Sequence, residues 1–248
     1  MKIEIVQRNY VAKEKLTDLI DKINDKLFFA PNIERTFTGN IVDCVIKEDV
    51  PSDEFLRFVL KYLNPKKNFI SHLFLMQSET LKFTISDCAL NQYPDLLQRV
   101  KIADNALLFY KFYFNDNPII NFMSHSGHFN IKNKTAADSF LLKTHFLEKG
   151  YEAYDYQLDT ALSNENRIKK GLPESNNANI IIANDINEGN SIVKSFMLTN
   201  QFNVCGFLIG TDIPVILNSR SHTDLEQQLA IDFIFKGERN ENKGNTAL

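Results

Sequence analysis

The sequence predicts an α/β fold built on a parallel or mixed sheet. Three apolar runs in the last third, 180–183, 204–209 and 214–217, are rich in β-type residues. They are too short for helices and too apolar for strands that are covered on one face only. Strand and helix patterns also alternate along the rest of the chain, which is typical of a sheet covered by helices.

The first part of the chain begins with one β-α unit. Residues 2–7 alternate polar and apolar side chains, and 13–27 carry apolar residues at helical spacing. A second helix is predicted over 52–63, with Ser52 or Asp53 as its N-cap.

The middle of the chain continues this alternation. Short apolar runs predict strands, and longer segments with apolar residues three or four apart predict helices. The predicted elements are, in order, a strand at 70–76, a strand at 81–85, a helix at 95–113 opened by Pro94, a strand at 119–123 and a helix at 135–149 ended by Gly150.

In the last third, 191–199 has the spacing of a helix and is long enough to cross over between parallel strands. We therefore expect 180–183 and 204–209 to be parallel strands, and 180–183 and 214–217 to be adjacent strands. The loop between 180–183 and this helix contains Gly189 and ends at Asn190, a candidate N-cap, so its backbone amides are expected to hold an anion.

A second polar loop follows the strand at 214–217. It contains Ser219 and Arg220, and Thr223 and Glu226 then have the spacing of a capping box that starts a helix. Both loops leave the carboxyl ends of strands, where ligands bind in open α/β sheets. The second loop offers a hydroxyl, a guanidinium and a carboxylate.

Composition excludes several classes of protein. The 248-residue chain has 44% hydrophobic and 24% charged residues, a net charge of −3 and no long run of like charges, which argues against nucleic acid and anionic membranes as partners. No apolar stretch approaches the roughly 20 residues of a membrane span, and the start has no signal sequence. Three dispersed cysteines, Cys44, Cys88 and Cys205, indicate reduced, buried thiols and a cytoplasmic location.

Several motifs, in order, resemble the phosphate acetyl/butyryltransferase family, and the butyryl branch most. The resemblance covers roughly residues 37–236. It is carried by Ser71-His72-Leu73-Phe74-Leu75-Met76, Ser86-Asp87-Cys88-Ala89-Leu90-Asn91, Asp104-Asn105-Ala106, Leu158-Asp159-Thr160-Ala161-Leu162, Lys170-Gly171-Leu172, Asp185-Ile186 with Gly189-Asn190, Lys194, Gly210 with Pro214-Val215, and Ser219-Arg220.

The resemblance implies a fold and an assembly. The fold is a three-layer α/β sandwich like that of isocitrate and isopropylmalate dehydrogenases, with two lobes and a cleft between them. The whole chain, 1–248, then forms one acyltransferase-like unit, with lobes at 1–90 plus 180–248 and at 91–179. The family is usually a homo-oligomer.

It also implies a reaction in which coenzyme A and phosphate exchange a short acyl group, with acyl-CoA as a substrate and no cofactor. A thiol with a pKa of about 8.5 needs a base at neutral pH, and the oxyanion needs hydrogen-bond donors. By resemblance, Ser219 and Arg220 hold the phosphate or the oxyanion, and Glu226 is the base. Asp224 and His222 remain alternatives for the base, and the alternative role of Glu226 is to close the capping box with Thr223.

The resemblance further assigns substrate binding to seven residues. These are Asp185, Gly189, Asn190, Lys194, Gly210, Asp87 and Asn91. Asp87 and Asn91 have a structural alternative, because residues at a strand end often cap the turn into the next helix. Met197 stands where acetyl-type members have an arginine, which favours a larger, butyryl-like acyl group.

Some features depart from the family. The N-terminal portion is shorter, residues 37–42 lack the family's basic and histidine features, and Ala183-Asn184 lacks the usual proline. They support an alternative, a non-catalytic relative that binds coenzyme A and serves as an interaction or regulatory subunit. His125, His128 and His145 do not have the pattern of a metal site, so no metal is expected.

Overall fold

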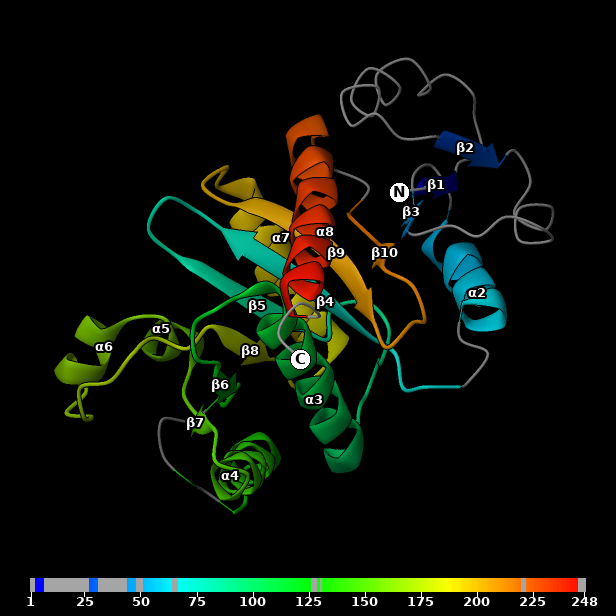
Figure 1. Cartoon of the computed structure of the whole chain (residues 1–248). Helices are drawn as coiled ribbons and strands as arrows, with labels where there is room; N and C mark the ends of the chain where they lie inside the picture. The colour runs from blue at the N-terminus through cyan, green and yellow to red at the C-terminus, as the bar shows by residue number, and fades with distance from the viewer. Residues whose placement is uncertain are drawn as a thin grey trace. The chain divides into compact units, whose positions relative to one another are not determined.

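The computed structural model describes residues 3–6, 27–30, 44–47, 51–63, 67–125, 129, 131–219 and 222–244. The helix predicted at 13–27 and the segment 37–42 lie outside this part, apart from Leu27, which begins a strand. The chain divides into two compact units, Met1–Ile70 with Cys205–Arg239 and Ser71–Val204 with Asn240–Leu248 (Figure 1). The predicted lobe boundaries differ from these, and the lobes stay a prediction.

The first unit has a mixed set of strands. Its elements are β1 (Ile3–Val6), β2 (Leu27–Ala30), β3 (Cys44–Lys47), α2 (Ser52–Tyr62), β9 (Asn203–Ile209), β10 (Val215–Ile216) and α8 (Asp224–Gly244). β1 lies between β2 and β3 and is parallel to both, β10 is parallel to β3, and β9 is antiparallel to β10. All four residues of β3 are buried, so this strand is covered on both faces.

Two predictions about these elements were wrong. The strand at 180–182 pairs with the strands at 82–86 and 119–122, whereas β10 pairs with β3 and β9, so 180–183 and 214–217 are not adjacent strands. Apolar runs identify buried strands but contain no information about which strands pair. The second error concerns α2, whose N-cap is Pro51 without a side-chain cap, in place of Ser52 or Asp53.

The second unit contains five strands with helices between them. Its elements are β4 (Ser71–Gln77), β5 (Lys82–Ser86), α3 (Leu96–Tyr113), β6 (Ile119–Phe122), α4 (Lys134–Glu148), β7 (Glu152–Tyr154), α5 (Leu158–Ala161), α6 (Asn164–Lys169), β8 (Ile180–Ile182) and α7 (Ile186–Leu198). β4 and β5 form an antiparallel hairpin, and β5, β8, β6 and β7 then run parallel in that order. β7 was not predicted.

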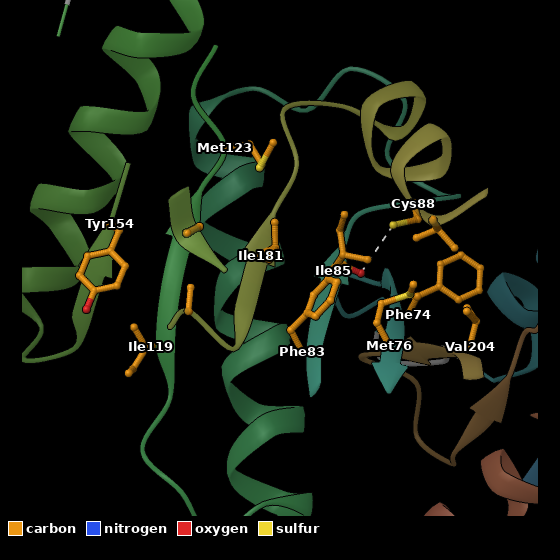
Figure 2. Packing of buried hydrophobic residues seen from close by; sticks show 13 residues of the cluster. Phe74, Met76, Phe83, Ile85, Cys88, Ile119, Met123, Tyr154, Ile181 and Val204 are labelled. Carbon is orange, nitrogen blue, oxygen red and sulfur yellow. Dashed lines mark hydrogen bonds between the residues drawn. The ribbon is translucent and has the colours of Figure 1, made fainter. Parts of the chain in front are cut away.

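Helices cover both faces of these strands, giving three layers. α3 packs on β4, β5 and β8, and α4 packs on β6, β7 and α3. On the opposite face Ile181 belongs to a buried cluster with Phe83, Ile85 and Val193 of α7 (Figure 2). Because neighbouring residues of a strand point to opposite faces, the buried Ile180 and Ile182 face the other layer. The α/β class with a mixed sheet is confirmed.

Three parallel strands of this unit end at one edge. Ala183 N donates to Ser86 O at 2.7 Å, and Met123 N donates to Ile182 O at 2.9 Å, so the ends of β5, β8 and β6 lie side by side. The helices that follow these strands, α3, α7 and α4, therefore start from the same carboxyl edge, where a ligand is expected in such sheets.

Candidate functional site

The loop after β5 is organised by the carboxylate of Asp87, which is 2% exposed. Oδ1 accepts hydrogen bonds from the backbone N–H of Ala89 (2.9 Å) and Leu90 (3.0 Å). Oδ2 accepts from the backbone and side-chain nitrogens of Asn91, at 3.3 and 2.5 Å. Asp87 and Asn91 thus build the loop that leads into α3, which is the structural alternative considered for them; their contact with substrate stays a prediction.

Gly189 lets α7 pack directly against this loop. A Cβ at this position would lie 2.6 Å from the carbonyl oxygen of Asp87 and 2.9 Å from Sγ of Cys88. Both distances are shorter than real Cβ contacts, so only glycine fits without movement of the loop. Gly189 therefore fixes the distance between α7 and the loop after β5 at this edge.

The start of α7 differs from the prediction. The helix begins at Ile186, five residues before the predicted start, and its N-cap is Asp185 in place of Asn190. The carboxylate of Asp185 accepts hydrogen bonds from the backbone N–H of Asn187 (2.8 Å) and Glu188 (2.9 Å). These amides are consequently bound by the protein's own carboxylate, so the prediction that loop amides hold an anion was wrong for this pair.

The remaining predicted residues of α7 lie further along the helix. Asn190 is half-buried and Lys194 is exposed. Glu188 connects the helix to neighbouring loops: its Oε2 accepts from the backbone N–H of Asn184 at 2.7 Å, and its Oε1 lies 3.7 Å from Nε2 of His125, just after β6. The loops after β5, β6 and β8 thus meet around the first turn of α7.

Arg99 belongs to the same edge and was missed by the sequence analysis. It lies in the first turn of α3 and is 2% exposed. Burial lowers the pKa of the Arg99 guanidinium to about 10. The carboxylates of Asp138, Glu188 and Asp185 raise this pKa and so offset part of the effect of burial. The available signal was the position of Arg99, three residues after Leu96 and four before Ala103, which places it among apolar residues on one side of the predicted helix.

In the first unit, Ser219 follows β10 and is half-buried. His222 folds back on it, with its backbone N–H donating to Ser219 O at 3.1 Å and its Nδ1 2.7 Å from the same oxygen. These contacts hold the backbone after β10 close to the residues that precede α8. Arg220, the predicted phosphate ligand, lies outside the described residues.

Glu226 forms the predicted capping box. Its Oε2 accepts hydrogen bonds from the backbone N–H (2.7 Å) and the hydroxyl (3.1 Å) of Thr223, and its own N–H donates to Thr223 Oγ1 at 3.2 Å. Glu226 is 6% exposed and its carbonyl accepts from the thiol of Cys205. The capping role is therefore confirmed, and its role as the base stays a prediction.

Gly210 closes the end of β9 in a conformation that needs glycine. Its φ is +99°, and a Cβ there would lie 2.3 Å from the carbonyl oxygen of Phe69. A structural requirement accounts for this residue, and its predicted contact with substrate is not tested by the geometry.

The predicted site residues thus form two groups. Asp87, Asn91, Asp185, Gly189, Asn190 and Lys194 belong to the second unit, and Gly210, Ser219 and Glu226 to the first. Within the described part of the chain, no group of three or more histidine, cysteine or acidic residues is placed to hold a metal ion. None of the described helices is both long and apolar enough to cross a membrane.

Comparison with solved structures defines the fold. A branched-chain phosphotransacylase from Enterococcus faecalis V583 superposes with a TM-score of 0.77 at 19% identity, over 96% of this chain and 99% of the other. Isocitrate dehydrogenase from Methylococcus capsulatus superposes with a TM-score of 0.52 at 7% identity, over 95% and 83%. The chain therefore has the α/β fold of isocitrate dehydrogenase-like proteins, as predicted.

Sequence comparison gives the family. Residues 12–230 match the family described as Phosphate acetyl/butaryl transferase, and the chain belongs to this family. It is 26% identical to phosphate butyryltransferase from Clostridium acetobutylicum over 236 residues, 90% of this chain and 77% of that protein. It is 28% identical to phosphate acetyltransferase from Rickettsia typhi, over 73% of this chain and about half (55%) of that protein.

Proposed function

We propose that the protein is a phosphate acyltransferase that exchanges a short acyl group between coenzyme A and phosphate. The observation that carries the proposal is the family match over residues 12–230. The predicted acyl group is butyryl-like, in line with the butyryltransferase relative and with Met197 in place of an arginine.

The reaction joins a thiol and an acyl phosphate, or phosphate and a thioester, through a tetrahedral intermediate. Donors are needed for the phosphoryl oxygens and for the developing oxyanion, and a base is needed for the thiol. We assign the donors to Ser219 and Arg220 and the base to Glu226, with His222 and Asp224 as the alternatives. Atoms balance without a metal or cofactor, because the acyl group leaves sulfur for oxygen while the thiolate takes up a proton.

The edge of the second unit is proposed to hold the other parts of the substrates. Three helices start there, at the carboxyl edge where ligands bind in open α/β sheets. Asn190 and Lys194 lie on α7, and Lys194 is exposed. These residues are the proposed ligands at this edge, while Asp87, Asn91, Asp185 and Gly189 hold its backbone in place.

A homo-oligomeric assembly and a cytoplasmic location are part of the same proposal, and both rest on the family resemblance. The three cysteines support a reducing environment, because all of them are buried thiols outside any disulfide.

A non-catalytic relative that binds coenzyme A is the second candidate. The observation that favours it is that several predicted site residues, Asp87, Asp185 and Glu226 among them, have carboxylate oxygens bound by neighbouring backbone N–H groups. Oxygens that already accept these bonds are less available to substrate, as expected where the residues serve the scaffold.

One assay separates the two candidates. Purified protein is mixed with butyryl-CoA or acetyl-CoA, with and without phosphate, and the free thiol of coenzyme A is followed. The transferase releases thiol only when phosphate is present. Binding of coenzyme A without any phosphate-dependent release would instead support the non-catalytic candidate.

A further inference from the structure

Arg99 is a buried cation whose hydrogen-bonding capacity is largely unused. Its side chain is 2% exposed, and neither Nε nor Nη2 has a hydrogen-bond partner among the described residues. A guanidinium carries five N–H donors in a planar fork. Burying such a group without partners is costly, so it is rarely found without a reason.

Three carboxylates act on Arg99 electrostatically without pairing to it. They belong to Asp138 of α4 and to Asp185 and Glu188 of α7. In the described part of the chain no ion pair within 4.0 Å joins any of them to Arg99. Each is bound elsewhere: Asp138 to Lys134 Nζ at 2.6 Å, Asp185 to the first amides of α7, and Glu188 to the backbone and side chain of Asn184. The carboxylates therefore do not occupy the N–H donors of Arg99.

The position of Arg99 is the expected place for a ligand. It lies in the first turn of α3. Of its electrostatic neighbours, Asp185 is the N-cap of α7, Glu188 lies in the first turn of α7, and Asp138 lies in the second turn of α4. These three helices follow β5, β6 and β8, whose carboxyl ends are side by side. A buried guanidinium with unused donors thus stands where three helix N-termini converge.

We propose that Arg99 binds a phosphoryl group of a substrate through forked hydrogen bonds at this edge. The proposal rests on the proposed function and adds a specificity residue to it. A phosphoryl oxygen pair matches the geometry of the guanidinium fork, and the group remains cationic at neutral pH. Two substrates bring such a group, inorganic phosphate (or the acyl phosphate) and coenzyme A with its own phosphates.

The test uses three variants of the full chain. Arg99→Met removes charge and donors at similar length, and Arg99→Lys keeps the charge but removes the fork. Lys101→Gln is the matched control, because it removes one positive charge from an exposed position two residues along the same helix. Binding of coenzyme A is measured by calorimetry, and binding of inorganic phosphate by the concentration dependence of the melting temperature. Neither readout requires turnover.

For Arg99→Met we expect Kd to rise at least tenfold for one of the two ligands, and the affected ligand identifies the source of the phosphoryl group. Arg99→Lys should recover only part of the affinity, and Lys101→Gln should stay within twofold of the wild type. The melting temperature of unliganded Arg99→Met should equal or exceed that of the wild type, because an unpaired buried charge has been removed.

Two results would overturn the proposal. If Arg99→Met binds both ligands within twofold of the wild type, Arg99 is not a ligand and the proposed function stands. If the wild type binds neither ligand, both the proposal and the proposed function fail. Should Arg99→Met not fold, Arg99→Lys decides: unchanged affinity for both ligands means that the charge only balances the neighbouring acids.

Discussion

Thr223 and Glu226 close a reciprocal capping box at the start of α8, in which Glu226 Oε2 lies 2.7 Å from Thr223 N and Thr223 Oγ1 lies 3.2 Å from Glu226 N. Thr223→Ala removes the hydroxyl acceptor, so we expect the free energy of unfolding to fall by about 1 kcal/mol. Chemical denaturation measures the loss. An unchanged stability would mean that the box does not contribute.

Glu226→Gln separates the two roles of this side chain. Glutamine still accepts the hydrogen bonds of the box, so we expect stability within about 0.5 kcal/mol of the wild type. A base needs the carboxylate, and its loss should lower the phosphate-dependent rate about 100-fold or more. Asp224→Asn is the control on the adjacent acid. Full activity of Glu226→Gln would remove it from the mechanism and leave Asp224 or His222.

Gly210→Ala should destabilise the first unit strongly. The added Cβ meets the carbonyl oxygen of Phe69 at 2.3 Å, and the positive φ of 99° is unfavourable for alanine. We expect a loss of about 3 kcal/mol, measured by urea denaturation. Gly150→Ala is the matched control, because it also has a positive φ (+84°) but its Cβ would meet nothing within 4 Å; about 1 kcal/mol is expected there. Equal losses would contradict the steric argument.

Arg167 is a fully buried structural cation, in contrast to Arg99. Its Nη1 donates to the carbonyl oxygens of Thr160 (2.7 Å) and Ala161 (3.1 Å), and its Nη2 donates to Asn177 Oδ1 at 2.9 Å. Arg167→Met leaves these acceptors unpaired, so we predict a loss of about 3 kcal/mol in thermal or urea unfolding. The exposed Lys169→Met is the control; it breaks only the exposed ion pair with Glu165, so its loss of stability should be at most a small fraction of that in Arg167→Met.

Cys205 predicts a dependence on alkaline pH. Burial, and then the charge of Glu226, raise its pKa from 9.0 to about 12. The folded state thus favours the protonated thiol, so this contribution to stability is complete below pH 9 and is lost as pH rises to 12. Cys205→Ala should flatten the decline of stability over this window. An identical pH profile for the variant would contradict the assigned shift.

Burial of the three cysteine thiols also predicts that they react slowly in the folded protein. Cys44, Cys88 and Cys205 are all buried, and the raised pKa of Cys205 leaves about one thiolate in ten thousand at pH 8. In a chromogenic disulfide-exchange assay we expect no rapid labelling of the folded protein and three thiols after unfolding. A thiol that reacts within seconds in the native state would contradict the buried assignment.

Much of the fold could be predicted because the spacing of apolar residues and the residues that cap helices are local signals. The hairpin β4–β5, the long helix α3 after Pro94 and the Thr223–Glu226 box were all visible in the sequence. Strand pairing is not local, which explains why 180–183 and 214–217 were wrongly expected to be adjacent. β7 was missed because a strand of three residues is too short to show an alternation of polar and apolar side chains.

The sequence shows which candidate residues follow strands, but it does not show the role of each residue. A carboxylate such as Asp185 has the same sequence context whether it caps a helix or binds substrate, and only the hydrogen bonds to Asn187 and Glu188 distinguish the two. Arg99 was missed because an arginine on a helix is usually exposed. Its burial depends on neighbours from α4 and α7, which no local pattern reveals.

The most direct test of the central claim is to identify the product. Butyryl-CoA and phosphate are incubated with the protein, hydroxylamine is added to trap butyryl phosphate as its hydroxamate, and the hydroxamate is compared with the thiol released. The proposed function predicts equal amounts of both, and a loss of about 100-fold or more in Arg220→Ala, as expected when an oxyanion or phosphate donor is removed. Thiol release without hydroxamate, or equal rates in Arg220→Ala, would contradict acyl transfer to phosphate by the predicted residues.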